Sequence, residues 1–416
     1  MSEHSYIDLY LEYTRETECA TLFNRWTAIS NMAAWLGRRV YFPFGTFKIH
    51  ANMYIMFVGL AGTKKSTAIK IGQRYLKSAG YKHFAANKTR QEKFLLDLAE
   101  APITSQEVDI LDVNLFGDEP LHTTPVECYV AADEVNNFIG VGNLEFMSIL
   151  GDLWDYDDVF KYRLKNSDSV ELYYPTINIL SGNTYEGFSR LFPPEAIGTG
   201  FFSRMIFVNA PPTDIKYTIM PTPDEKIDAE MNAILQRVKT SLTGAMPHTP
   251  AAYEILDLLY RNVEGVPDMR FDAYNNRRLT HLIKLCMVVA ASRESLTVDA
   301  QDVIYANTIL TYTEHFMPKA LGEFGKARSS GASHKVMDII NRAGAPITVQ
   351  AIWKEAHQDL DSRQQLFNLL GDLQLADKIQ PVEGGAFLPK NTPIKAEQDL
   401  LAVDWSLLTE AERELI

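Results

Sequence analysis

The sequence predicts an α/β layer fold, and two observations lead to this prediction. Residues 51–210 alternate strand-like apolar runs with helix-forming segments, which is the pattern of a sheet covered by helices. In addition, the apolar run at residues 53–58 breaks into a short glycine-containing loop that ends in Lys65 and Ser66. A helix-forming segment, residues 67–76, follows this loop, and such a strand–loop–helix order is typical of a phosphate-binding loop.

Length, composition and charge limit the possible classes of protein. The 416 residues are too many for one typical core and suggest about two or three domains. No apolar run approaches the roughly 20 residues of a membrane span, and the first residues do not resemble a signal peptide, so export is not expected. Cys19, Cys128 and Cys286 are isolated, which argues against structural zinc and a disulfide framework. With a net charge of −13, any contact with nucleic acid requires a local basic feature.

Changes in composition divide the chain into five segments. In the first, apolar residues recur at helical spacing until Gly37 closes the helix, and a short strand follows at residues 40–42. Residues 101–125 are polar, acidic and interrupted by prolines, which indicates a surface insertion. The predicted segments are a helical lead-in at 1–50, the α/β core at 51–212, an all-helical segment at 224–328, a compact module at 334–390 and an acidic tail at 391–416.

The loop supplies groups that bind phosphate. Its glycines let backbone N–H groups close around phosphate oxygens, and the N-terminus of the next helix adds a partial positive charge. We expect Lys65 to reach the β- and γ-phosphates of ATP and the Ser66 hydroxyl to ligate Mg²⁺. Lys64 stands where G-x-x-x-x-G-K-[ST] has its last glycine, and the alternative is an ordinary strand–turn–helix. The predicted nucleotide-binding residues of the loop are Gly59, Gly62, Thr63, Lys64, Lys65, Ser66 and Thr67.

A second apolar run, residues 128–132, ends in two adjacent carboxylates. Asp133 would bind nucleotide-associated Mg²⁺ through its water shell, and Glu134 would orient and deprotonate the attacking water. A solvated turn is the alternative interpretation. The position of Asp133 some 68 residues after Lys65 favours the catalytic one.

Two further strand ends carry candidate catalytic residues. The run at residues 176–181 leads to Asn183, whose amide is predicted to sit between the γ-phosphate and the water; an Asx-turn is the alternative. Arg204 precedes the run at residues 205–209 and is predicted to reach the γ-phosphate of a neighbouring subunit. The alternatives are a surface salt bridge for Arg204, and Arg190 as the catalytic arginine.

Together these segments resemble the P-loop ATPases of phage and plasmid replication modules, which are related to minichromosome maintenance helicases and superfamily-three viral helicases. The resemblance covers roughly residues 20–325 and implies an AAA+ type core that uses ATP and Mg²⁺. It also implies a hexameric ring around single-stranded or forked DNA, in the cytoplasm of a bacterium or a phage-infected cell. A basic residue such as Lys64 looks like a variant tolerated in that family. The stretches that carry the resemblance are residues 51–59, 131–134, 176–183 and 200–204.

The helical segment adds an independent likeness. Residues 276–287 with 296–303 are similar to the lid of minichromosome maintenance proteins, where an arginine two residues before a leucine senses the nucleotide. Arg277 aligns with that arginine, and Arg278 is its neighbour. The alternative for Arg277 is an arginine that solvates a helix face. The stretch from Thr297 to Asp302 is instead predicted to be structural, as a helix N-cap with acids in the first turn.

Alternation around residues 166–169 predicts a β-hairpin with a basic face. In the related ring helicases, a hairpin at this place projects into the central pore and follows the DNA backbone. A basic hairpin would make such a pore positive within an acidic protein, whereas the alternative is an ordinary solvated face. The predicted DNA-binding residues are Lys161, Arg163 and Lys165.

Residues 334–390 have the pattern of a winged helix, with three helices and a short hairpin. Six Lys and Arg against seven Asp and Glu favour protein docking slightly over DNA recognition. The tail at 391–416 is predicted to be either a docking helix, for example for a replication partner, or disordered. The leading hypothesis is a ring-forming DNA helicase. An ATP-switched loader or origin-binding scaffold is the second hypothesis, and a defence or regulatory ATPase is the third.

Overall fold

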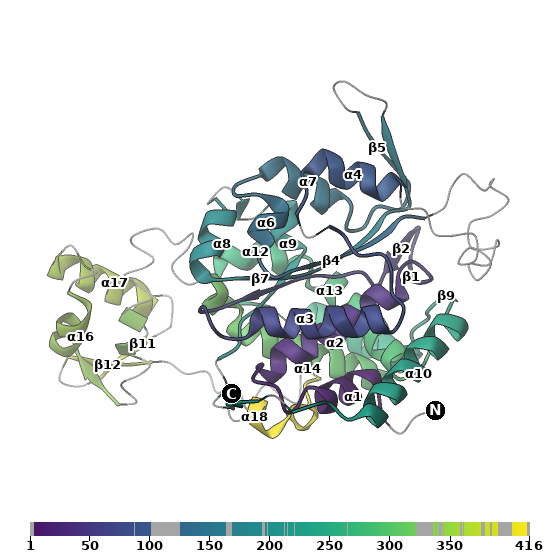
Figure 1. The fold of residues 1–416 in the computed structure, drawn as a ribbon. Helices are drawn as coiled ribbons and strands as arrows, with labels where there is room; N and C mark the ends of the chain where they lie inside the picture. The colour runs from purple at the N-terminus through teal and green to yellow at the C-terminus, as the bar shows by residue number, and fades with distance from the viewer. Residues whose placement is uncertain are drawn as a thin grey trace. The chain divides into compact units, whose positions relative to one another are not determined.

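The computed structural model contains two compact units, Met1–Gly322 with Leu401–Ile416 and Glu323–Leu400 (Figure 1). The first unit contains the predicted α/β core. The structure describes residues 4–86, 88–100, 125–163, 169–193, 196–197, 199–211, 213, 215–219, 221–263, 265–321, 336–337, 339–340, 343, 345–357, 360, 362–375, 379–382, 385–389 and 402–413.

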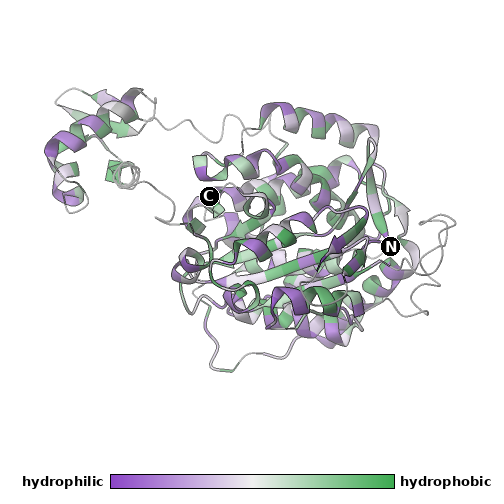
Figure 2. Cartoon of the chain, turned by 90° about the horizontal axis from the view of Figure 1, so that it is seen from above, coloured by the Kyte–Doolittle hydropathy of each residue, from purple (hydrophilic) through white to green (hydrophobic). Residues whose placement is uncertain are grey.

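Four parallel strands form the central sheet of the first unit, in the order β4-β7-β3-β8. Strands β3, β7 and β8 are buried along their whole length, as expected for a parallel sheet covered on both faces. Figure 2 colours the strands in the middle of this unit mainly as hydrophobic. The four strands are β3 (Tyr54–Val58), β4 (Glu127–Ala132), β7 (Thr176–Asn183) and β8 (Met205–Val208).

The strand register brings the carboxyl ends of all four strands to one edge of the sheet. This edge therefore collects the residues that follow β3, β4, β7 and β8 in sequence. Ligands of open α/β sheets bind at such an edge. The paired residues nearest to it are Val58 with Asn183, Phe57 with Val208, and Ala132 with Ser181.

Helices cover both faces of the sheet, which confirms the predicted α/β layer fold. Helices α2 and α3 lie on one face, and α6 and α8 lie on the other (Figure 1). Helix α2 ends at Gly37 as predicted, because φ is 54° there and a Cβ would lie 2.3 Å from the Glu127 carboxylate. These helices are α2 (Thr21–Leu36), α3 (Lys65–Ser78), α6 (Val135–Ile139) and α8 (Tyr185–Leu191).

The remaining elements surround this sheet. The predicted helical segment contains α10 to α14, and among its described residues β9, which pairs with β1, departs from the prediction. The helices are α1 (Tyr6–Tyr13), α4 (Gln91–Glu100), α7 (Leu144–Asp152), α9 (Gly200–Ser203), α10 (Glu225–Ser241), α11 (Pro250–Asn262), α12 (Asp272–Asn275), α13 (Arg278–Ser292) and α14 (Ala300–Leu321). The strands are β1 (Val40–Phe44), β2 (Phe47–His50), β5 (Val159–Tyr162), β6 (Val170–Tyr173) and β9 (Gly244–Ala245).

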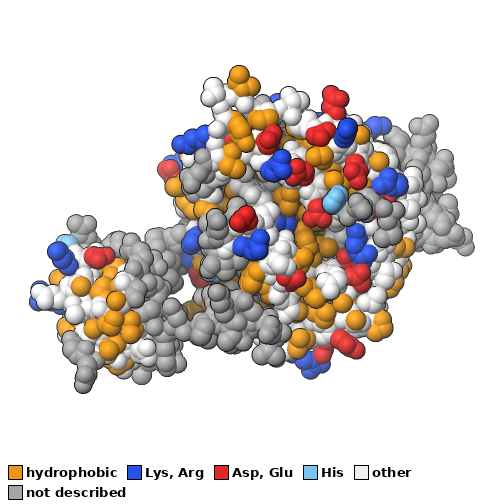
Figure 3. Space-filling model, turned by 90° about the horizontal axis from the view of Figure 1, so that it is seen from below, with side chains coloured by type: hydrophobic (Ala, Val, Ile, Leu, Met, Phe, Trp, Pro, Cys, Tyr) orange, Lys and Arg blue, Asp and Glu red, His pale blue; other side chains and the backbone are white. Residues whose placement is uncertain are grey.

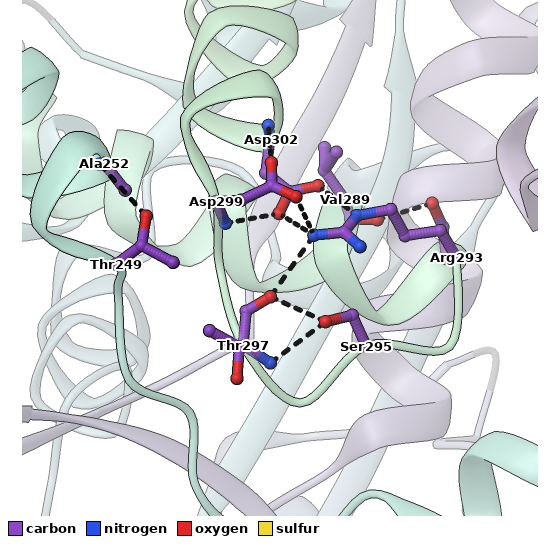
Figure 4. A network of polar contacts seen from close by, with 9 residues as sticks. Thr249, Ala252, Val289, Arg293, Ser295, Thr297, Asp299 and Asp302 are labelled. Carbon is purple, nitrogen blue, oxygen red and sulfur yellow. Dashed lines mark hydrogen bonds and ion pairs between the residues drawn. The ribbon is translucent and has the colours of Figure 1, made fainter.

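The junction between α13 and α14 confirms the structural interpretation of the stretch from Thr297 to Asp302. The Asp302 N–H donates to Asp299 Oδ1 at 3.1 Å, and the Asp299 N–H donates to Asp302 Oδ2 at 2.8 Å. Arg293, at the end of α13, donates to both carboxylates of this reciprocal cap (Figure 4). The junction is therefore a capped N-terminus of α14 that Arg293 stabilises.

The described part of the predicted tail, residues 402–413, docks on the first unit. Arg25 on α2 donates to both carboxylate oxygens of Glu412, at 3.1 and 2.6 Å, and to the Tyr305 hydroxyl at 2.7 Å. Leu408 is also buried. This part of the tail is therefore ordered on its own chain, and docking to a partner stays a prediction. It contains a 3₁₀ turn (Trp405–Leu407) and α18 (Glu410–Arg413).

The second unit has a small core of its own, formed by residues such as Val336, Ile352 and Leu366. Its three strands are ordered β10-β12-β11 and antiparallel. Residues 101–124 of the predicted insertion lie outside the described residues, and none of the described helices could cross a membrane. The elements of this unit are β10 (Ile347–Thr348), α16 (Val349–Ala356), α17 (Arg363–Leu375), β11 (Ile379–Val382) and β12 (Ala386–Pro389).

Candidate functional site

Two residues of the loop between β3 and α3, Gly62 and Lys64, have left-handed backbone conformations. Gly62 has φ of 83°, and a Cβ added there would meet no atom within 4 Å. Lys64 has φ of 60° at the start of α3, which explains why glycine is expected at this position. A lysine in this left-handed conformation costs roughly 1–2 kcal/mol relative to a right-handed one.

The ammonium of Lys65 closes this loop from within. Nζ donates to Gly59 O at 3.0 Å, to Leu60 O at 2.6 Å and to Thr63 Oγ1 at 2.9 Å. Burial lowers the pKa of Lys65 to about 8. Because all three partners are neutral, the charge is not compensated, and phosphate oxygens could replace these acceptors while favouring the charged form.

The strand β4 delivers Asp133 to the helix that follows the loop. Asp133 Oδ2 lies 2.6 Å from Lys70 Nζ on α3. Lys70 stands four residues after Ser66, so both side chains occupy the same face of α3, about 6 Å apart along its axis. A Cβ at Gly182 of β7 would lie 2.7 Å from Asp133 O, so glycine permits this close approach. The exposed Glu134 follows at the start of α6.

Asn183 ends β7, between the loop strand β3 and the acidic strand β4. Its carbonyl accepts the Gly59 N–H at 3.3 Å, which ties it to the loop. Its side-chain amide donates to Asn136 Oδ1 at 2.8 Å, and its Oδ1 accepts the Thr184 N–H at 3.0 Å. Asn183 therefore lies at the carboxyl edge, as predicted. Its side-chain amide group is held by Asn136 of α6 and by Thr184 at the start of α8.

Asn209 is a residue of this edge that the sequence reasoning missed. It follows β8, and its amide donates to Val58 O at 2.9 Å and to the Tyr185 hydroxyl at 2.7 Å. The sequence contains a signal for Asn209, because this residue is a polar amide at the end of an apolar run, as Asn183 is.

The oxygen donors at this edge suit a Mg²⁺ ion that arrives with a nucleotide. Within the described ranges, no cluster of three or more His, Cys, Asp or Glu could hold a metal ion by itself. The candidate protein donors are the hydroxyl of Ser66, in the first turn of α3, and the carboxylate of Asp133, which pairs with Lys70 of the same helix. Mg²⁺ is commonly bound through one or two carboxylates together with substrate phosphates and water, so these residues fit such an ion.

Arg204 and Arg277, predicted independently, meet at one carboxylate. Arg204 Nη2 lies 3.4 Å from Asp155 Oδ1, and Arg277 Nη1 lies 3.9 Å from Asp155 Oδ2. Arg277 Nε also donates to Ser203 Oγ at 2.9 Å. The Arg204 side chain is 12% exposed and also donates to Gly200 O at 2.8 Å. Asp155, which the sequence reasoning missed, carries no local signal of this role.

The arginine pair and the phosphate loop lie at opposite edges of the sheet. Arg204 precedes Met205, which pairs with Tyr54 at the amino end of β3, whereas the loop follows Val58. The length of β3 separates these edges by about 13 Å. The arginines therefore do not line the loop of their own chain.

The other predicted arginines have local partners. Arg190 forms an exposed ion pair with Glu186 within α8, at 2.7 Å. Arg278 is buried and donates to both oxygens of Glu314 at 2.9 Å. Each of these two guanidinium groups is therefore paired with a carboxylate of its own chain.

The predicted hairpin exists as β5 and β6, but its basic face is partly neutralised. Lys161 pairs across the strands with Glu171, and Nζ lies 2.8 Å from Oε1. Arg163 is exposed, and Lys165 lies outside the described residues. On the face of the first unit shown in Figure 3, basic and acidic side chains are interspersed.

Comparisons with known proteins assign no family to this chain. A scan against models of protein families finds no match, and no curated protein matches significantly. The chemistry is therefore inferred from the residues themselves. An uncompensated ammonium, a hydroxyl and two carboxylates at one sheet edge form a set that can bind a polyphosphate and activate water.

Proposed function

We propose that this protein is a Mg²⁺-dependent ATPase that works as a ring-forming DNA helicase or translocase in the replication of a phage or another mobile element. The observation that carries this proposal is the Lys65 ammonium, whose hydrogen-bond partners among the described residues are neutral loop oxygens. Asp133 provides further support, because its carboxylate lies 2.6 Å from Nζ of Lys70, which is on the same helix as Lys65.

The residues predicted at the carboxyl edge would each have a role in hydrolysis. Lys65 binds the β- and γ-phosphates, and Ser66 with Asp133 would hold Mg²⁺, which neutralises charge on the phosphates when bound. Glu134 accepts the proton of the attacking water. The bond between the γ-phosphorus and the bridging oxygen breaks, so that ADP and inorganic phosphate leave. Asn183 would orient the water from its place beside the loop.

The separation of the arginines from the loop supports an active site completed between subunits. Arg204 and Arg277 would stabilise the transition-state charge on the nucleotide of a neighbour. The hexameric ring and the AAA+ type core are part of the same proposal, and the place of β7 between β3 and β4 supports the core. Among the described residues of the second unit, helices α16 and α17 and the antiparallel strands β10, β11 and β12 support a winged helix.

A comparison of wild-type protein with Lys65→Ala tests this function. We expect Mg²⁺- and DNA-stimulated ATP hydrolysis and strand displacement on forked DNA. Loss of the charge-assisted contacts of Lys65 should lower ATP affinity about 100-fold, with loss of strand displacement. A wild-type protein that neither binds nor hydrolyses ATP would refute the proposal.

An ATP-switched helicase loader or origin-binding scaffold is the second candidate. It is favoured by the pairing of Lys161 with Glu171, because a translocating pore needs a positive surface. The nearly balanced charge of residues 334–390 also suits protein docking. DNA-stimulated hydrolysis without strand displacement would favour this candidate over a motor.

The hairpin gives a separate test of DNA contact. Arg163→Ala should lower DNA-stimulated hydrolysis while the basal rate survives, and it should reduce the salt slope of DNA affinity by about 1. Lys161→Ala should have a smaller effect, because Glu171 already neutralises this lysine. Steady-state hydrolysis and DNA binding at several salt concentrations measure both. Unchanged stimulation in Arg163→Ala would show that the hairpin does not contact DNA.

A further inference from the structure

A lysine occupies a strained backbone position at the base of the phosphate loop. Lys64 has φ of 60° and ψ of 18°, in the left-handed region where glycine is favoured. Strain of this kind is concentrated at active sites and ligand-binding loops, where the surrounding structure holds it. The next residue, Lys65, already supplies the ammonium that closes the loop, so the second ammonium needs a purpose of its own.

The Lys64 side chain is held by a carboxylate from a distant part of the chain. Its Nζ lies 2.5 Å from Glu18 Oε2, and this hydrogen bond lowers the pKa of Glu18. Glu18 Oε1 accepts the Tyr217 N–H at 2.9 Å, and Lys64 O accepts a bond from Cys19 Sγ at 3.6 Å. The turn before α2 and the segment before α10 therefore meet at the loop.

This ion pair is placed so that a stronger anion can displace it. The Lys64 side chain is 44% exposed and that of Glu18 is 16% exposed, so solvent screens the pair. A triphosphate in the loop brings several negative charges next to the start of α3, where Lys64 stands. A polyanion competes well with a single carboxylate for an exposed ammonium.

We propose that Lys64 is a second phosphate-binding cation and that Glu18 withholds it until a nucleoside triphosphate enters the loop. This inference rests on the proposed function and deepens it. Displacement of Lys64 leaves Glu18 with the Tyr217 N–H and with the nearby charge of Lys216. Occupancy of the loop is thereby linked to the segment that precedes α10.

Calorimetric titration of the full chain with MgATP tests the inference. Glu18→Gln removes the competitor and should tighten ATP binding by up to about fivefold. Lys64→Gly removes the ammonium and should weaken binding about tenfold. Because Glu18 acts through Lys64, the double variant should bind ATP as Lys64→Gly does, which is the coupling that a double-mutant cycle measures.

The exposed carboxylate of Glu16 provides a matched control, and Glu16→Gln should bind ATP as the wild type does. If Glu18→Gln leaves ATP affinity unchanged or weakens it, Glu18 does not withhold Lys64 and the inference fails. If Lys64→Gly binds as the wild type does, Lys64 is not a phosphate ligand. Either result leaves the proposed function standing provided that Lys65→Ala loses binding, whereas a wild-type chain without ATP affinity overturns both.

Discussion

Replacing Arg204 by alanine should lower the rate of ATP hydrolysis by about 10³-fold or more, while ATP affinity changes little. An arginine supplied by a neighbouring subunit stabilises charge that develops only in the transition state, and its loss has effects of this size. Arg277→Ala should reduce the rate in the same direction. Single-turnover hydrolysis, with ATP affinity measured separately, distinguishes this effect from weaker binding.

Mixing two inactive variants decides whether Arg204 acts on a neighbour. Lys65→Ala lacks the ammonium that binds the phosphates, and Arg204→Ala lacks the arginine. A mixed assembly nevertheless contains interfaces at which both residues are intact. We therefore expect partial recovery of hydrolysis on mixing. Arg190→Ala is the matched control, because its exposed pair with Glu186 lies within one helix. If the mixed variants assemble and remain inactive, Arg204 does not complete the site of a neighbour.

The Arg204 guanidinium is engaged by three groups of its own chain. Its guanidinium lies 5.7 Å from the centre of the Trp154 ring and is shared between Gly200 O and Asp155. Its buried Nε has no hydrogen-bond partner among the residues that the structure describes. Asp155 also lies 3.9 Å from Arg277, so one carboxylate lies beside both arginines.

The carboxyl-edge site could be predicted because its signals are local. Apolar runs that end in Lys65, Asp133 and Asn183 indicate strands, and parallel strands bring their ends to one edge. The order of the strands was not predictable in this way. It depends on which strand packs beside β3, and this places Asn183 rather than Asp133 next to the loop.

The features that the sequence did not reveal depend on contacts between distant residues. Asp155 meets Arg204 and Arg277 only after α13 has packed beside the end of α9. Similarly, the alternation of residues predicted that Lys161 lies on an exposed face. The pairing of Lys161 with Glu171 depends on the register between two strands, which the pattern of one strand does not reveal.

Arg25→Ala should lower the free energy of unfolding by about 3–5 kcal/mol, because it leaves the carboxylate of Glu412 buried without its partner. The two side chains are only 1% and 2% exposed, and they join α2 to the last helix of the chain. Urea unfolding followed by circular dichroism measures the change. Arg15→Ala, which breaks the exposed pair with Glu12, should change stability by less than about 1 kcal/mol.

The double replacement Arg25→Met with Glu412→Leu separates the charge from the docking of the tail. Removing both charges leaves no buried unpaired group, so this variant should recover most of the stability that Arg25→Ala loses. Because α2 packs against α3, tail docking also supports the layer that carries Lys65. We therefore expect Arg25→Ala to lose ATP binding at lower urea concentration than the wild type. Equal stability of Arg25→Ala and the wild type would show that Glu412 is not buried in this pair in solution.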